Sequence, residues 1–104
     1  YVHVDDLADA HLRVLGHLKP GQLVDYNLGT GVGVSVEEVI SAARKITGHE
    51  IPVVHSPRRA GDPAVLMGDA SKAASELGWT AKHKHIDEVI ASAWAWHKTH
   101  PNGY

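Results

Sequence analysis

The feature that most constrains the fold is the alternation of short β-branched stretches with longer amphipathic ones. Alternation with a period of two predicts strands, and apolar residues spaced three and four apart predict helices. The stretches expected to form strands are residues 1–4, 22–28 and 51–55, with 64–68 as a possible fourth. The stretches expected to form helices are residues 6–18, 36–47, 70–77 and 86–99. This pattern predicts one small mixed α/β domain over residues 1–104, with three to four short strands and about four helices.

Start and stop signals sharpen several of these boundaries. Ser35 and Glu38 have the S-x-x-E spacing of a capping box, and Gly48 stands where a helix beginning at residue 36 would end. Asp5 or Asp6 is expected to cap the first helix by the same logic. The other expected signals are Asp69 before and Gly78 after the short helix, and Pro101 after the last one.

Composition excludes several classes of function. The chain has 104 residues and a formal net charge of −2, which argues against a broad nucleic-acid-binding face. It has no cysteine, so disulfides and thiolate metal sites are excluded. No apolar run approaches the ~20 residues of a membrane helix, and the first residues lack the basic start of a signal peptide. We therefore expect a cytoplasmic protein; because the sequence opens inside an expected strand, we also expect it to be part of a longer one.

Two look-alike motifs have plainer interpretations. Gly29, Gly31 and Gly33 follow an expected strand and precede a capped helix, but their G-x-G-x-G spacing differs from the dinucleotide-binding G-x-G-x-x-G. A tight turn is the favoured interpretation, although the helix start at Val36 could still face an anion or a polar ring. The close histidine pairs, 83/85 and 97/100, have no third ligand at fixed spacing, so metal binding is not expected.

The stretch "SPRRAGD", residues 56–62, is the strongest candidate for ligand contact. Arg58 and Arg59 should point in opposite directions on an extended backbone, and a guanidinium fork suits a diphosphate because it engages two oxygens at once. Asp62 is placed to accept hydrogen bonds from hydroxyls such as those of a ribose. A structural, salt-bridged turn is the alternative interpretation, and the residues alone leave both open.

No catalytic arrangement is recognisable in the sequence. The tyrosines are Tyr1, Tyr26 and Tyr104, and none has a lysine four residues later. There is also no G-x-S-x-G, H-E-x-x-H or Walker lysine loop. The chain therefore offers binding residues without a reactive centre.

Five segments, in order, nevertheless resemble one family. "YVHVDDLADAH", "YNLGTGVGVSVEEV", "SPRRAGD", "DASKAASELGW" and "HPNGY" are similar to the C-terminal part of the UDP-glucose 4-epimerases, which are extended short-chain dehydrogenases/reductases. The resemblance covers essentially the whole chain. It implies the substrate-binding part of such an enzyme, without the N-terminal NAD-binding Rossmann domain and its catalytic residues.

The resemblance also implies a function for the whole enzyme. UDP-galactose and UDP-glucose would interconvert through a 4-keto sugar, with NAD accepting and returning the hydride. The implied substrate-binding residues here are Tyr1, Val36, Arg59 and Asp62, with Arg59 at the diphosphate and Asp62 at the ribose. No catalytic, cofactor-binding or metal-binding residue is implied in this chain. Leu66 stands where some relatives place a tyrosine or cysteine facing the sugar.

Further expectations follow from the same resemblance. The full-length enzyme should bind NAD, act on a UDP-sugar and form a homodimer, whereas this chain alone should be inactive and bind no NAD. No nucleic acid or membrane is expected as a partner. Two alternatives remain open: the same part of another nucleotide-sugar dehydratase, decarboxylase or dehydrogenase, and a stand-alone interaction module without catalysis.

Overall fold

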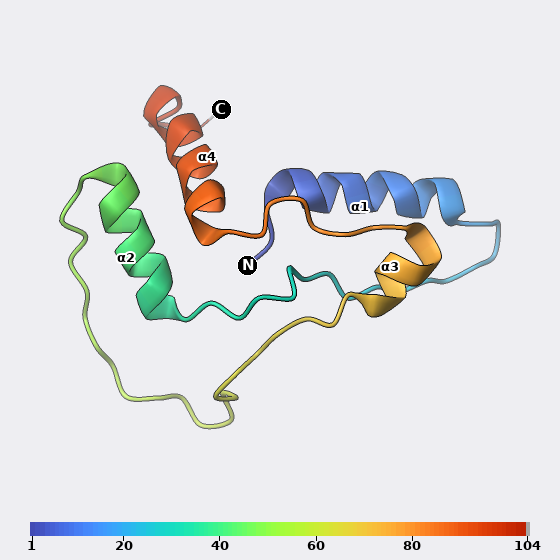
Figure 1. Cartoon of the computed structure of the whole chain (residues 1–104), viewed down its shortest axis with the longest axis horizontal. Coiled ribbons are helices and arrows are strands. Elements are labelled where there is room, and N and C mark those ends of the chain that lie inside the picture. Colours follow the sequence, from blue (N-terminus) through green and yellow to red (C-terminus); the bar gives the residue numbers. More distant parts are fainter. Residues whose placement is uncertain (104) are drawn as a thin grey trace. The chain divides into compact units, whose positions relative to one another are not determined.

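The computed structural model describes residues 1–103 and contains helices joined by extended segments and turns (Figure 1). The helices are α1 (Val4–His17), α2 (Val36–Thr47), α3 (Ser71–Leu77) and α4 (Ile86–Thr99). None of the helices in this part of the chain is both long and apolar enough to cross a membrane.

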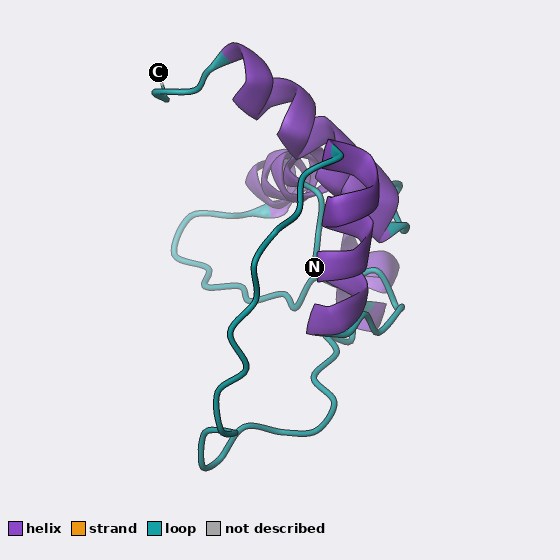
Figure 2. Cartoon of the chain, turned by 90° about the vertical axis from the view of Figure 1, so that its left-hand side faces the viewer, coloured by secondary structure: helices purple, strands orange, loops and turns teal. Residues whose placement is uncertain are grey.

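The predicted mixed α/β fold with three to four strands is wrong for the described residues, which contain no strand (Figure 2). Residues 22–28, 51–55 and 64–68 form neither strand nor helix, and the last of residues 1–4 already belongs to α1. β-branched composition reports that a segment tolerates extended backbone, whereas a strand also needs a neighbour whose amides and carbonyls pair with its own. The pattern of β-branched residues therefore supplied no information about pairing.

The chain divides into two compact units, each described by itself. The first comprises Tyr1–Gly33 with Met67–Lys84, and the second comprises Val34–Leu66 with residues 85–103. In the first unit α1 packs on α3, and in the second α2 packs on α4. The buried apolar cluster belongs to the first unit and consists of Ala10, Ala73, Trp79 and Ala81.

Asp6 links the start of α1 to the segment that follows α3. Its carboxylate is buried and accepts hydrogen bonds from the backbone amides of Lys82 at 3.1 Å and His83 at 3.0 Å. Its backbone carbonyl accepts a third bond from the Trp79 indole Nε1–H at 3.0 Å. Burial alone would raise the pKa of Asp6, but the amide hydrogen bonds from His83 and Lys82 bring the pKa below its usual value.

The predicted N-cap of α1 is wrong. Asp5 and Asp6 lie inside the helix, and His3 is the N-cap because its Nδ1 accepts the Asp5 amide at 3.1 Å. An imidazole nitrogen can replace a carboxylate here, since capping needs only an acceptor near the first free amides. Asp6 is thereby freed to point into the unit, on the same side of α1 as the buried Ala10.

The short helix α3 ends as the sequence predicts. Gly78 adopts a left-handed φ of 62°, and the Trp79 amide folds back to donate to the Ala73 carbonyl at 3.2 Å. Before the helix, Asp69 Oδ1 accepts the Ser71 amide at 2.9 Å. From α1, Arg13 Nη1 donates to the carbonyl oxygens at the end of α3, those of residues 77 (3.1 Å) and 78 (2.9 Å).

The second unit contains the boundaries that the sequence predicts best. The capping box at the start of α2 is complete: Ser35 Oγ accepts the Glu38 amide, and the Glu38 carboxylate accepts the Ser35 amide. Gly48 closes the helix at a left-handed φ of 71°. Lys45 of α2 pairs with Asp87 of α4 at 2.8 Å. The last helix, α4, has His85 as its N-cap, and the His85 side chain makes no capping hydrogen bond.

Candidate functional site

The predicted ligand loop is a tight turn on the surface of the second unit. The Asp62 amide donates to the Arg59 carbonyl at 3.4 Å, and Gly61 provides the left-handed φ of 89° that the turn requires. Arg58 Nη2 donates to the Asp62 carbonyl at 3.1 Å. Arg59 Nε lies 3.5 Å from the Asp62 carboxylate. Both arginines therefore contact Asp62, but at different groups: Arg58 donates to its backbone carbonyl, and Arg59 faces its carboxylate.

The Arg59–Asp62 pair is open to solvent. The two side chains are 90% and 54% exposed, and an ion pair of this kind contributes at most about 1 kcal/mol because water screens it. A diphosphate offers the guanidinium more negative charge and two oxygens in the geometry of its fork. The pair can therefore open at little cost, leaving Arg59 to an anion and Asp62 to hydroxyl donors.

Val36 occupies the first turn of α2 and is 66% exposed. The helix end beside it does not suit a phosphate. Glu37 and Glu38 both lie in the first turn, and the capping box already uses the Glu38 amide. The backbone hydrogen bond from Ser35 holds the pKa of Glu38 below its usual value, which keeps the carboxylate charged. Val36 thus offers an apolar surface next to negative charge, suited to a flat ring rather than to an anion.

The remaining residues predicted to contact the ligand are also exposed. Tyr1 is 62% exposed and belongs to the first unit. Leu66, at the position that the resemblance places near the sugar, is 86% exposed. Of the four predicted site residues, Arg59 and Asp62 are the two that the structure brings into contact.

The glycine-rich turn is used for backbone packing. A Cβ on Gly29 would lie 2.5 Å from the Gly68 carbonyl oxygen, and one on Gly33 would lie 2.9 Å from the Met67 sulfur. Gly31 adds a left-handed φ of 74°. Gly29 and Gly33 let the segment carrying them run against residues 67–68, so the space in front of these two glycines is filled by protein. The turn therefore does not fit the pyrophosphate of a dinucleotide.

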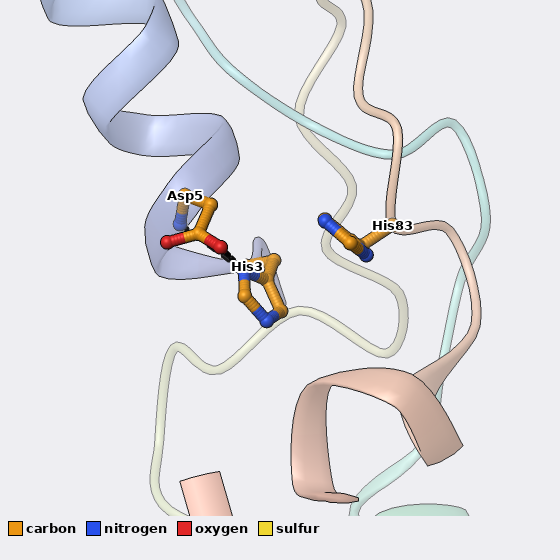
Figure 3. Close-up of side chains that lie close together, drawn as sticks. All are labelled: His3, Asp5 and His83. Atoms are coloured by element: carbon orange, nitrogen blue, oxygen red, sulfur yellow. Dashed lines mark hydrogen bonds and ion pairs between the residues drawn. The ribbon is translucent and has the colours of Figure 1, made fainter. Parts of the chain in front are cut away.

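A cluster that the sequence did not predict joins His3 and Asp5 at the start of α1 to His83 after α3 (Figure 3). The rings of His3 and His83 lie 4.2 Å apart between centroids, at 31° to one another. His3 is buried, His83 is half-buried and Asp5 is exposed. The sequence pattern pointed only to histidines close together along the chain, whereas His3 and His83 are 80 residues apart. The Asp6 hydrogen bonds to the Lys82 and His83 amides help to bring the two segments together.

Comparison with known proteins identifies what the chain resembles. No protein-family model matches it. It is 50% identical over 105 residues to a UDP-glucose 4-epimerase of Lactobacillus helveticus, covering 100% of this chain and 32% of that protein. It is 49% identical over 104 residues to UDP-arabinose 4-epimerase 1 of Arabidopsis thaliana, covering 100% of this chain and 25% of that protein.

A solved structure supports the same relationship. The UDP-glucose 4-epimerase of Bifidobacterium longum in complex with NAD+ and UDP is 49% identical, with a TM-score of 0.85 over 100% of this chain and 31% of that one. The chain thus spans about a third of the length of the relatives that it matches. The match lies in the C-terminal portion of these epimerases, as the sequence motifs indicate. Matches to epimerases do not favour a dehydratase, a decarboxylase or an interaction module.

Proposed function

Starting from this similarity to the C-terminal portion of UDP-glucose 4-epimerases, we propose that the chain is the UDP-sugar-binding portion of such an enzyme. The observation that carries the proposal is a match along the entire chain at about half identity to proteins with that name. The exposed Arg59–Asp62 turn supplies the chemistry, because it presents a cation and an acid that are only weakly tied to each other.

Each predicted site residue has a role in this proposal. Arg59 binds the diphosphate, and Asp62 accepts hydrogen bonds from the ribose hydroxyls. Val36 lies against the nucleotide base, and Tyr1 also contacts the substrate in this proposal. Arg58 does not touch the ligand and instead keeps the turn in shape through the Asp62 carbonyl.

The proposal assigns the reaction itself to residues outside this chain. NAD, when bound in the full-length enzyme, accepts and returns the hydride, and the N-terminal Rossmann domain holds it. The packed glycine turn supports this division, since this chain offers the cofactor no phosphate loop there. The isolated chain should then be inactive and bind no NAD. We further propose that the full-length enzyme is a cytoplasmic homodimer of galactose metabolism.

The test uses the full-length protein and two neighbouring arginines. Arg59→Ala should raise the KM for UDP-galactose and weaken UDP binding by roughly tenfold or more, because it removes a charge-assisted contact worth about 1.5–3 kcal/mol. Arg58→Ala is the matched control and should change UDP affinity by much less. Equal UDP affinity in the Arg59 variant and the wild type would show that Arg59 is not at the diphosphate. A full-length protein that does not interconvert UDP-galactose and UDP-glucose would exclude the activity itself.

A UDP-pentose is the second candidate substrate. It is favoured by the 49% identity to a protein named UDP-arabinose 4-epimerase. Pentose and hexose differ at C5, so the preference depends on what faces that carbon rather than on the diphosphate contact. Comparing kcat/KM for UDP-arabinose and UDP-galactose in the same preparation distinguishes the two, and Arg59→Ala should weaken both substrates alike.

A further inference from the structure

The His3–Asp5–His83 cluster goes beyond the proposed UDP-sugar function, because none of its three residues is among the proposed substrate-binding residues. One atom that can bind a metal ion from each of the three side chains lies within 4.8 Å of the others. His3 and Asp5 begin α1, whereas His83 lies on the segment after α3 (Figure 3). The fold therefore brings two imidazoles and a carboxylate to one place from two separate segments.

This donor set suits zinc. Zn²⁺ binds imidazole nitrogen and carboxylate oxygen at about 2.0–2.2 Å, and a site with three protein ligands keeps a fourth position for water. Tetrahedral bonds of that length place neighbouring ligand atoms about 3.3–3.5 Å apart. The atoms here lie within 4.8 Å of one another, and His3 Nδ1 is 3.8 Å from Asp5 Oδ2, so they must move closer to bind an ion; the Asp5 side chain is 78% exposed and has room to turn toward the histidines.

The surrounding residues hold His3 and His83 close together before any ion binds. The Asp6 carboxylate accepts a hydrogen bond from the backbone amide of His83 and so fixes the backbone there. The same carboxylate adds a buried negative charge beside the cluster, which favours a cation. His3 is 5% exposed, so its ring has little freedom to turn away. Ligands held in this way lose little conformational freedom on binding.

His3 already has one role, because its Nδ1 accepts the Asp5 amide as the cap of α1. An ion would either take Nδ1 from this amide or bind through Nε2 and leave the cap in place. Either way, the ion lies at the first turn of α1, where the Asp5 carboxylate is 3.8 Å from His3 Nδ1. A neutral His3 serves both roles, since a cap acceptor and a metal ligand each need an unprotonated nitrogen.

We propose that His3, Asp5 and His83 form a zinc site that ties the first turn of α1 to the segment after α3. The site is structural in this proposal, and it brings no new reaction. Bound zinc should raise the thermal midpoint of the chain, because an ion that binds the folded state alone stabilises it by mass action.

The experiment is a titration of the full chain, purified without a histidine tag, with zinc chloride in an isothermal calorimeter. We expect one ion per chain, and His83→Gln and Asp5→Asn should each weaken binding by at least tenfold. His85→Gln is the matched control, two residues from His83 and outside the cluster, and should leave affinity unchanged. In ¹⁵N-edited NMR spectra, the ring signals of His3 and His83 should shift when zinc is added.

Several outcomes would overturn the proposal. It fails if the wild-type chain does not bind zinc, or if His85→Gln weakens binding as much as His83→Gln. It also fails if the ring signals that shift belong to other histidines. Should His83→Gln unfold the chain, as judged by circular dichroism, the exposed Asp5→Asn decides alone: unchanged zinc affinity in that variant contradicts the site.

Discussion

Removal of the Asp6 carboxylate is the sharpest test of how the first unit is held together. The carboxylate is 2% exposed and accepts the Lys82 and His83 amides at 3.1 and 3.0 Å. A hydrogen bond to a charged group contributes about 1.5–3 kcal/mol, and a buried donor left without a partner adds its desolvation cost. In Asp6→Ala both amides lose their acceptor, so we expect a loss of about 3–5 kcal/mol in the free energy of unfolding this unit.

Asp6→Asn removes the charge of the side chain but keeps its shape, so it shows how much of the loss in the free energy of unfolding comes from the charge. Its amide oxygen can still accept one backbone N–H, but its NH₂ group faces the other, so the expected loss is about 1.5–3 kcal/mol. Asp5→Asn is the neighbouring control, since that side chain is 78% exposed, and in metal-free buffer it should lose less than about 1 kcal/mol.

Native-state hydrogen exchange is the assay that reports on these bonds directly. In Asp6→Ala the amides of Lys82 and His83 should exchange roughly a hundredfold to a few thousandfold faster than in the wild type, because every 1.4 kcal/mol of the expected loss is a factor of ten. The indole N–H of Trp79, which donates to the Asp6 carbonyl, should lose protection as well. If Asp6→Ala and Asp5→Asn are equally stable, the two amide bonds do not hold the unit together and the reasoning is refuted.

Three further outcomes follow from the described contacts. Arg13→Lys keeps the charge but loses the fork that reaches two carbonyls, and chemical denaturation should show a loss of about 1–2 kcal/mol; an unchanged midpoint would contradict this role. Gly68→Ala places a Cβ 2.7 Å from a backbone oxygen and should cost about 1–3 kcal/mol, whereas Gly16→Ala, with nothing within 4 Å, should be neutral or stabilising by thermal melting. Because the folded pKa of Glu38 is lowered, its stabilising contribution is present above the unfolded pKa and is lost as the pH falls through the folded value. Ser35→Ala removes the Oγ hydrogen bond to the Glu38 carboxylate but keeps the backbone one, so the Glu38 pKa should rise only part of the way in an NMR titration, and an unchanged pKa would show that the Ser35 hydroxyl does not contribute.

The helices could largely be predicted because their boundary signals are local. The capping box of α2 and the glycine after it lie within the helix's own sequence neighbourhood, and the observed bounds, Val36–Thr47, match the expected ones. The strands could not be predicted in this way, because pairing depends on a neighbouring segment that composition does not reveal. The N-cap of α1, His3, could not be predicted either, because histidine is not among the usual capping residues.

The candidate site also combines features that local sequence predicts with features that depend on distant segments. The sequence predicts that Arg58 and Arg59 point in opposite directions, whereas in the structure both reach Asp62, Arg58 at its backbone carbonyl and Arg59 at its carboxylate. Their contact with UDP stays a prediction. The encounter of His3 with His83 could not be predicted from spacing, because it depends on Asp6 reaching the far segment. Asp6 was the available signal for this contact, because a buried acid inside a helix requires hydrogen-bond donors from elsewhere in the chain.

The bracing of α3 by Arg13 has a consequence for the order of folding. A helix of seven residues is too short to persist alone in water, because its nucleation cost exceeds what so few internal bonds return. Its last carbonyls are met by a guanidinium 64 and 65 positions earlier in the chain. Closing so long a loop is slow, and α3 should therefore be among the last parts to form during refolding. In a stopped-flow experiment, protection of the α3 amides should lag behind that of α2, whose capping and closing contacts are all local.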